Sequence, residues 1–408
     1  MLVKMLMMIF NPRESSLPNI FPITLTMLTL ISPSNINCQF DEGYYTSDYA
    51  IKCPPEREIA PCKCNNSSGE MECYGVKIND CSVRQVFSQL ANYYVNTAER
   101  HVKSLKLYKT ELTHMAEDIL GDMSLEAIDL NGNQNISLTR IHRTSLVKSK
   151  ETLKSFKFSG LSEASWITKE ENDGSIFEIV DSFNQLAIFW VTDASIPKIQ
   201  RSAFGRVELP RLTSVQLARD EIEDLGDYAF YRLPNLTSLS IRDNLISRLT
   251  NHTFAFEKSS DELLTLDLRG NLLQMQNIDK DAFTRLRRPV HLNLEYNLIE
   301  YLDEDVFTPI LSNVRSTISV NKNPIKCDCR MQWLKRDDHN YMDRVEGLVC
   351  PEATELWYFT VEDLLNECNE TYRLEQLALS SSHLIKQSTK LLSILIILLI
   401  IHPIFTLN

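Results

Sequence analysis

A nine-fold repeat in the middle of the chain constrains the fold more than any other feature. Segments with the spacing LxxLxLxxN recur, and residues 263–271 (Leu-Leu-Thr-Leu-Asp-Leu-Arg-Gly-Asn) are a full example. The central apolar residues of the nine segments lie 23 to 33 residues apart, at Leu105, Ile128, Phe156, Phe189, Val215, Leu239, Leu266, Leu292 and Ile318. A repeat of this length cannot bury its own apolar face, so neighbouring repeats must stack.

Each part of the repeated segment has a physical role. The LxL alternation has a period of two, which predicts a strand with one buried and one outward face. The final Asn is suited to hydrogen-bonding the backbone of a tight turn. The motif and its period resemble those of leucine-rich-repeat proteins. This resemblance implies an α/β-type solenoid, a horseshoe of about nine repeats over residues 100–322 with a concave parallel β-sheet. A polar insertion around residues 163–181 separates the third repeat from the fourth.

A second column of apolar residues supports the stacking. Phe204, Phe230, Phe254 and Phe307 each follow the second LxL position by 13 residues, and Phe283 comes two residues late. An aromatic residue at a fixed offset in successive repeats predicts a stacked spine in the core rather than a cofactor site.

The ten cysteines form two clusters, six between Cys38 and Cys81 and four between Cys327 and Cys368, with none in between. Clusters at the two ends of a repeat array indicate disulfide-bonded caps over residues 38–81 and 323–368, in an oxidising compartment. Zinc is the alternative, because Cys62-Lys63-Cys64 and Cys327-Asp328-Cys329 are CxC pairs. Structural zinc sites more often use pairs separated by two to four residues.

Both clusters resemble known caps. The segment 323–334 (Asn-Pro-Ile-Lys-Cys-Asp-Cys-Arg-Met-Gln-Trp-Leu), followed by Cys350 and Cys368, resembles the C-terminal cap of extracellular leucine-rich-repeat proteins. The resemblance implies Cys327–Cys350 and Cys329–Cys368 disulfides, with Trp333 packed on the last coil. Residues 53–73 resemble the matching N-terminal cap, which implies Cys53–Cys64 and Cys62–Cys73 and leaves the pairing of Cys38 and Cys81 open.

A narrower resemblance rests on the N-terminal cap. The run from Cys53-Pro to Cys62-Lys-Cys64, followed by Cys81-Ser82 and Phe87, is similar to arthropod leucine-rich-repeat proteins related to the non-catalytic subunit of Oplophorus-luciferin 2-monooxygenase. This resemblance implies an extracellular repeat glycoprotein without a catalytic role of its own.

Both ends of the chain carry targeting features. Residues 1–34 read as a signal peptide. A short stalk, residues 369–382, precedes a hydrophobic C-terminal signal over residues 383–408, whose unbroken apolar run has 11 residues. A spanning helix needs about 20, so a GPI-attachment signal with Ser380 as the attachment site is favoured over a single-pass anchor. Sequons fit a secreted glycoprotein and begin at Asn65, Asn66, Asn135, Asn235, Asn251 and Asn369.

The sequence contains no enzymatic signature. Glycine is scarce at 11 residues, and the motifs GxGxxG, GxxxxGK[ST], GxSxG and HExxH are missing, so we expect no catalytic residues, no cofactor and no metal site. The net charge of −12 disfavours nucleic acid as a partner.

The outward face of the predicted sheet is the candidate binding surface. An exposed Trp beside arginines has the composition of a binding hot spot, although a solvated sheet face is the simpler interpretation of each single residue. The candidates are Lys106, Lys157, Trp190, Arg219, Arg242, Arg269 and Glu295. We expect recognition of a protein ligand or receptor by a membrane-attached, cell-surface protein. The alternative is a non-catalytic partner subunit that stabilises a secreted enzyme.

Overall fold

The computed structural model describes residues 53–75, 79–94, 100–112, 114–117, 119–130, 140–142, 144–159, 176–204, 206–335, 340–351 and 354–368. The chain divides into units 1–45 and 46–408, and all described residues belong to the second. The signal peptide, Cys38, Asn135, Asn369, Ser380 and the C-terminal tail lie outside the described residues. Within the described ranges, no helix combines the length and apolar character needed to cross a membrane.

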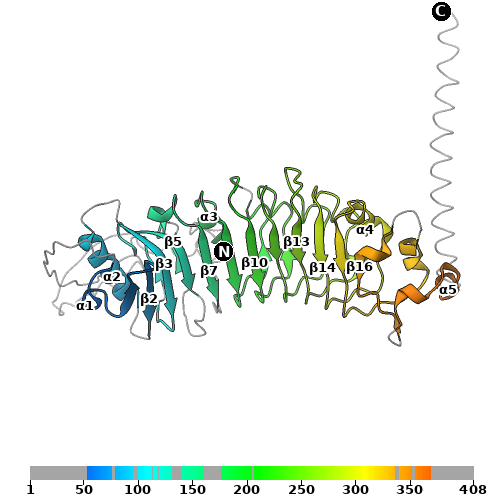
Figure 1. The fold of residues 1–408 in the computed structure, drawn as a ribbon, viewed down its shortest axis with the longest axis horizontal. Coiled ribbons are helices and arrows are strands. Elements are labelled where there is room, and N and C mark those ends of the chain that lie inside the picture. The colour runs from blue at the N-terminus through cyan, green and yellow to red at the C-terminus, as the bar shows by residue number, and fades with distance from the viewer. Residues whose placement is uncertain are drawn as a thin grey trace, which may run out of the picture. The chain divides into compact units, whose positions relative to one another are not determined.

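One sheet of 12 strands dominates the second unit (Figure 1). Its strands, in their order in the sheet, are β1 (Cys62–Asn65), β2 (Glu70–Tyr74), β3 (His101–Tyr108), β5 (Ser124–Leu130), β7 (Ser155–Ser159), β8 (Ile188–Thr192), β10 (Ser214–Ala218), β12 (Ser238–Ser240), β13 (Leu264–Asp267), β14 (Val290–Asn293), β15 (Thr317–Ser319) and β16 (Val345–Glu346). All neighbouring pairs are parallel except β1 with β2, which are antiparallel. The fold is a leucine-rich-repeat solenoid, as the sequence predicts.

The register of the sheet confirms the repeat assignment. The nine central apolar residues from Leu105 to Ile318 pair with one another across successive strands, and all nine are buried. The caps lengthen the same sheet, because Met71 of β2 pairs with Leu105 and Val345 of β16 pairs with Ile318. Two short parallel pairs lie outside this sheet, β4 (His114–Met115) with β6 (Arg140–Ile141) and β9 (Lys198–Ile199) with β11 (Asp224–Leu225).

The predicted aromatic spine forms the core behind the sheet. Phe204, Phe230, Phe254, Phe283 and Phe307 are buried and stack in sequence, with ring centroids 5.8, 6.3, 5.9 and 6.1 Å apart. Phe283 keeps its place although it comes two residues late, since its repeat contains an additional 3-10 turn, η3 (Met275–Asn277). These contacts are the packing that one repeat cannot supply alone.

The insertion before the fourth repeat is not polar throughout. Helix α3 (Ile176–Val180) ends it and buries four apolar side chains. Phe177 of this helix extends the aromatic spine, with its ring centroid 5.1 Å from that of Phe204. The prediction of a polar insertion over residues 163–181 is therefore wrong for residues 176–180, where the apolar side chains fill the space beneath β8.

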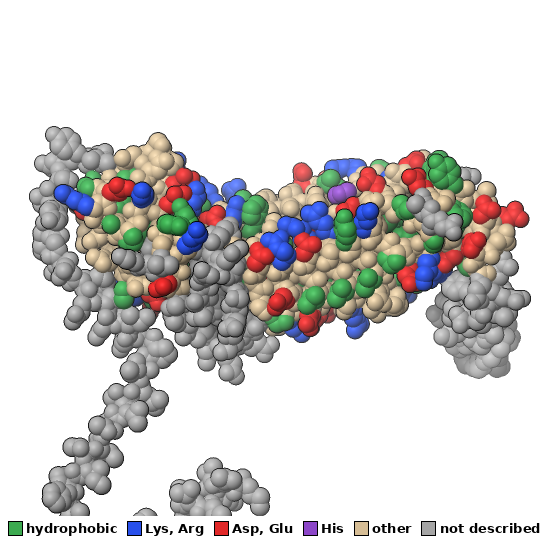
Figure 2. Space-filling view, turned by 90° about the horizontal axis from the view of Figure 1, so that it is seen from below, with side chains coloured by type: hydrophobic (Ala, Val, Ile, Leu, Met, Phe, Trp, Pro, Cys, Tyr) green, Lys and Arg blue, Asp and Glu red, His purple; other side chains and the backbone are tan. Residues whose placement is uncertain are grey.

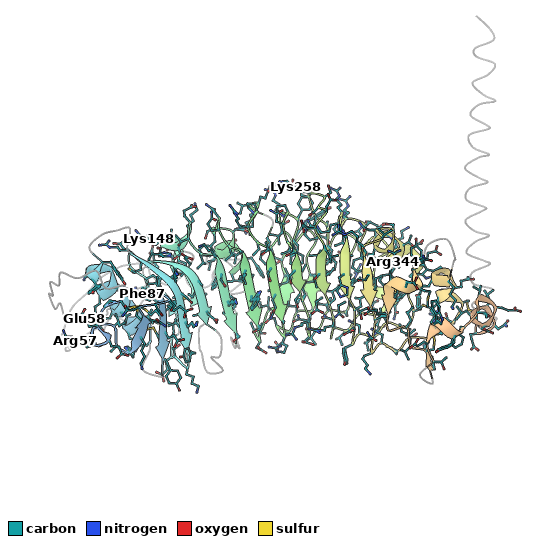
Figure 3. The ribbon with its side chains drawn as sticks, viewed as in Figure 1. Arg57, Glu58, Phe87, Lys148, Lys258 and Arg344 are labelled. Atoms are coloured by element: carbon teal, nitrogen blue, oxygen red, sulfur yellow. A yellow bond between two sulfur atoms is a disulfide. The ribbon has the colours of Figure 1, made fainter. Side chains whose placement is uncertain are left out.

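The N-terminal cap combines helix α1 (Glu56–Ile59), the β1–β2 hairpin and helix α2 (Asp80–Tyr93). A capping box between Asn79 and Ser82 starts α2, and Phe87 points from this helix into the core (Figure 3). Disulfides join Cys53 to Cys64 and Cys62 to Cys73, and Cys81 is also disulfide-bonded. Because α2 continues to Tyr93, the cap extends beyond its predicted boundary at residue 81.

The C-terminal cap is built from short helical turns. Its elements are η4 (Cys329–Lys335), η5 (Met342–Arg344), η7 (Leu356–Tyr358) and α5 (Val361–Asn366). Helix α4 (Glu304–Leu311), which carries Phe307, and the turn η2 (Val147–Ser149) belong to the repeats, the latter to the second repeat. Disulfides join Cys327 to Cys350 and Cys329 to Cys368. The buried Trp333 donates its indole N–H to the Leu302 carbonyl at 2.9 Å. The four disulfides are the pairs that the cap resemblance implies, and the zinc interpretation of the CxC pairs is wrong.

Candidate binding face

Three columns of outward side chains cross the sheet, and we call them together the outward face. The central column contains Lys106, Asp129, Lys157, Trp190, Gln216, Ser240, Asp267 and Asn293. The column two residues earlier is mostly small, with Ser104, Ala127, Ser155, Ile188, Ser214, Ser238, Thr265 and His291. The column two residues later includes Ser159, Thr192, Ala218, Arg242, Arg269 and Glu295. The predicted candidates lie in the central column and in the column two residues later, except Arg219.

Trp190 is the largest side chain of the central column and is half-buried. Its indole N–H donates to the Ser214 hydroxyl at 3.1 Å, and the Lys157 ammonium lies 3.8 Å from its ring centroid. The hydrogen bond and the cation–π contact hold the ring in one orientation. A large aromatic surface that is already ordered loses little conformational entropy on binding.

The strands that follow Trp190 carry mostly small outward residues. On β10, Gln216 pairs with Trp190 and is flanked by Ser214 and the buried Ala218, and β12, one strand further, carries Ser238 and Ser240. Neighbouring strands are ~4.8 Å apart, so beyond Gln216 the next large side chains, Arg242 and Arg269, lie two to three strands away. Trp190 therefore faces an area where a partner can approach the backbone of the sheet.

The far side of this area carries Arg242, Arg269 and Glu295. The Arg242 guanidinium lies 2.7 Å from Asp243, and that of Arg269 lies 3.3 Å from Asp267. Glu295 accepts hydrogen bonds from Asn321 at 2.9 Å and Ser319 at 2.8 Å, which lower the pKa of its carboxyl group.

Burial raises the pKa of the Asp267 carboxyl despite its arginine partner. This half of the face therefore presents paired charges rather than a field of one sign.

Arg219 lies in the turn after β10 instead of on the outward face. It has a positive φ of 60°, as do Asp193 and Asp243 at the same position of neighbouring repeats. Its guanidinium binds the Asp193 carboxylate through two hydrogen bonds of 2.6 and 2.8 Å, which lower the pKa of Asp193. Alternation from Leu217 already gives the outward position to Ala218, so the prediction of Arg219 on the outward face is wrong.

The remaining candidates are also engaged within the chain. The Lys106 ammonium lies 3.8 Å from Glu70 and 3.7 Å from Glu72, both in the N-terminal cap. Lys157 contacts Trp190 as described. Sequence reasoning placed Asp243 and Asp267 near the arginines but missed Asp193, which follows β8 directly in the sequence. The charged side chains of the candidate face are thus held in place and largely neutralised by partners within the chain.

The edge at which the strands end carries both charged and apolar side chains. Figure 2 shows basic and acidic groups gathered along this edge, with a row of hydrophobic side chains beside them. Leu245, Leu272 and Leu298 follow the turn in three successive repeats and are 43%, 42% and 43% exposed. At the opposite edge lie Lys148 and Lys258 (Figure 3), and Lys258 pairs with Glu208. The described sequon residues Asn65, Asn66, Asn235 and Asn251 are exposed.

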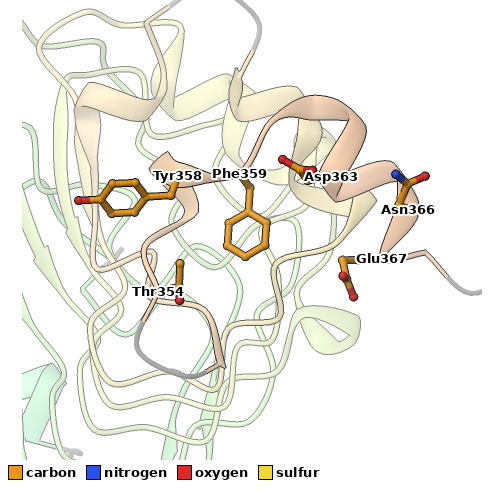
Figure 4. Close-up of a pocket in the computed structure, with 6 residues that line it drawn as sticks. All are labelled: Thr354, Tyr358, Phe359, Asp363, Asn366 and Glu367. Carbon is orange, nitrogen blue, oxygen red and sulfur yellow. The ribbon is translucent and has the colours of Figure 1, made fainter.

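A hollow of about 320 Å³ lies apart from this face, in the C-terminal cap (Figure 4). Its lining residues are Thr354, Tyr358, Phe359, Asp363, Asn366 and Glu367. Asp363 caps helix α5 and accepts hydrogen bonds from Thr360, which lower its pKa. The six lining residues include no Ser, Cys or His.

Comparison with known proteins agrees with this architecture. The leucine rich repeat family matches residues 210–273. The fold is that of a leucine-rich-repeat protein. The non-catalytic subunit of Oplophorus-luciferin 2-monooxygenase from Oplophorus gracilirostris is 23% identical over 347 residues, which are 80% of this chain and 90% of the subunit. This agrees with the resemblance of the N-terminal cap.

Two further proteins are similar to parts of this chain. Leucine-rich repeat-containing protein 3 of Danio rerio is 26% identical over 42% of this chain, which spans about half of that protein, 55% of its length. The crystal structure of human trophoblast glycoprotein aligns with a TM-score of 0.42 and 17% identity, over 75% of this chain and 98% of that one.

Proposed function

We propose that this protein is an extracellular, membrane-attached binding module that recognises a protein ligand or receptor on its outward face. The single observation that supports the proposal is the fixed Trp190 ring, which lies beside strands whose outward residues, apart from Gln216, are small. Aromatic side chains in such settings contribute most of the energy of protein interfaces. Arg242, Arg269 and Glu295 would surround this anchor and select the partner by charge pattern.

The extent of the face also supports a macromolecular ligand. From β7, which carries Lys157, to β14, next to Glu295, five steps between strands of ~4.8 Å each give about 24 Å. A net charge of −12 and paired arginines do not favour nucleic acid. Sequons Asn235 and Asn251 lie outside the three columns of the outward face, so glycans there would leave the face open.

The test is a partner search followed by a matched pair of variants. The ectodomain, residues 38–380, is immobilised and its ligand is identified by mass spectrometry of captured cell-surface proteins. We expect Trp190→Ala to weaken the binding of that ligand by about 2 kcal/mol or more and to leave the melting temperature of the protein unchanged. Trp357→Ala removes another exposed tryptophan, in the C-terminal cap, and serves as the control. Equal affinities of both variants and the wild type would refute the assignment of the face.

A second candidate function rests on the relative that aligns with 80% of this chain, which is named a non-catalytic subunit. In this alternative the protein binds and stabilises a secreted enzyme and has no activity of its own. Size-exclusion chromatography of the native material distinguishes the two functions. A catalytic chain that co-elutes in a fixed stoichiometry supports the subunit role, whereas elution without one supports the ligand-binding role.

A further inference from the structure

Asparagines, three of them buried and Asn323 partly buried, link the repeats through a regular pattern of hydrogen bonds. The side-chain oxygens of Asn244, Asn271, Asn297 and Asn323 each accept a backbone N–H from the preceding repeat at 2.8 to 3.2 Å. Their amide groups donate to carbonyls one strand back, namely those of Leu217, Ile241, Leu268 and Leu294. Each residue thus needs both an acceptor and a donor.

Asp220 occupies this position in the repeat of β10. It is fully buried, and its Oδ1 accepts the Ala194 N–H at 2.9 Å, as the asparagine oxygens do. Its Oδ2 has replaced the amide nitrogen and is buried without a hydrogen-bond partner. The carbonyl that an amide would reach is that of Val191, because Val191 pairs with Leu217 in the sheet. A carboxylate cannot donate to it, whereas a neutral carboxylic acid can.

The charges around Asp220 do not offset its burial. Asp193 lies in the preceding turn, Arg219 and Glu221 in its own turn, and the Arg242–Asp243 pair in the next. Arg219 is committed to Asp193 through two hydrogen bonds, and Glu221 accepts from Ser195 at 2.8 Å. Burial raises the pKa of Asp220 to about 8, with hydrogen bonding from Ala194 opposing the shift.

We propose that Asp220 is protonated in the folded protein and that its carboxyl O–H donates a hydrogen bond to the Val191 carbonyl. The repeat array would then contain one link that depends on pH among several asparagine links that do not. This link lies directly beneath the Arg219–Asp193 turn, at the edge of the outward face.

The direction of the pH effect follows from proton linkage. An aspartate in an unfolded chain has a pKa near 3.8, well below the folded value of about 8. The folded state therefore binds the extra proton between these values, and this contribution is full below the unfolded pKa and is lost as pH rises toward 8. Relative to an asparagine at the same position, the wild-type unfolding constant should increase by up to tenfold per pH unit in this range.

The experiment compares urea unfolding of the full-length protein and its Asp220→Asn variant at pH 5, 6 and 7. We expect the variant to gain stability over the wild type progressively as pH rises. Asp181 is a second buried carboxyl group, whose pKa is raised to about 7 by burial. It is present in both proteins, so its contribution cancels in the difference between their unfolding free energies. The exposed Asp261→Asn substitution is the control and should leave the profile unchanged.

Infrared spectroscopy supplies an independent readout. At pH 6 the spectrum of the wild-type protein minus that of Asp220→Asn should show a protonated carboxyl C=O band, since the band of Asp181 is common to both proteins and cancels in the difference. A stability difference between wild type and Asp220→Asn that does not change with pH, together with identical infrared spectra, would overturn the proposal.

Discussion

Replacing Asn271 with alanine tests how strongly the asparagine links hold the solenoid. The side chain donates to the Ile241 and Leu268 carbonyls at 2.9 Å each and accepts the Ile246 N–H at 3.1 Å. The Leu268 carbonyl keeps the hydrogen bond from Asn297 at 3.1 Å. The Ile241 carbonyl and the Ile246 N–H are left as buried groups that lose their partner. Each such group costs ~1–3 kcal/mol, so we expect a loss of about 4 kcal/mol.

Urea unfolding followed by circular dichroism measures this loss as a shift of the transition midpoint at constant slope. Asn277→Ala is the matched control, since Asn277 belongs to the same repeat and is exposed. The control should change stability by less than about 0.5 kcal/mol. If Asn271→Ala destabilises the protein no more than Asn277→Ala, the backbone groups find other partners and the asparagine links are not structural. A lower slope for Asn271→Ala would indicate that the array unfolds in parts.

Two further predictions concern the caps and the membrane. Cys329→Ser opens a disulfide that spans 39 residues and should cost ~2–5 kcal/mol; we expect sharply reduced secretion, and normal secretion with unchanged melting would contradict a structural role. If the C-terminal signal directs GPI attachment, phosphatidylinositol-specific phospholipase C should release the protein from intact cells. Retention on the cells, with an epitope after Asn408 still attached, would favour the single-pass anchor.

The sequence predicts the sheet well because its signal is repeated. The segments around Leu239 and Leu266 match the repeat motif well enough to be recognised one by one. Poorer matches, such as the segment around Phe156, are assigned their register from the repeat period. The caps were predicted as separate pieces, whereas Met71 and Val345 pair with the first and last repeats. A single strand outside the repeat has no periodic signal that shows which neighbour it joins.

The candidate site was predictable only in part. Alternation predicts the outward position of Trp190, whereas Arg219 follows the outward position of Ala218 and lies in a left-handed turn. The ion pair of Arg219 with Asp193 joins residues 26 positions apart, so it depends on the stacking of two repeats. That Asp220 Oδ2 has no hydrogen-bond partner can likewise be recognised only by comparison with the neighbouring repeats, in which the asparagine amide groups donate to carbonyls.

The two end strands determine whether such a sheet can grow into a filament. Parallel strands with open edges invite another copy to add to the stack. Here the last strand, β16, has only two residues, and the first, β1, is an antiparallel strand closed by the Cys62–Cys73 disulfide. The sequon residue Asn65 ends β1, so a glycan there would stand at the open edge. The short last strand, the disulfide-closed hairpin and a glycan at Asn65 would therefore each oppose edge-to-edge growth of the sheet.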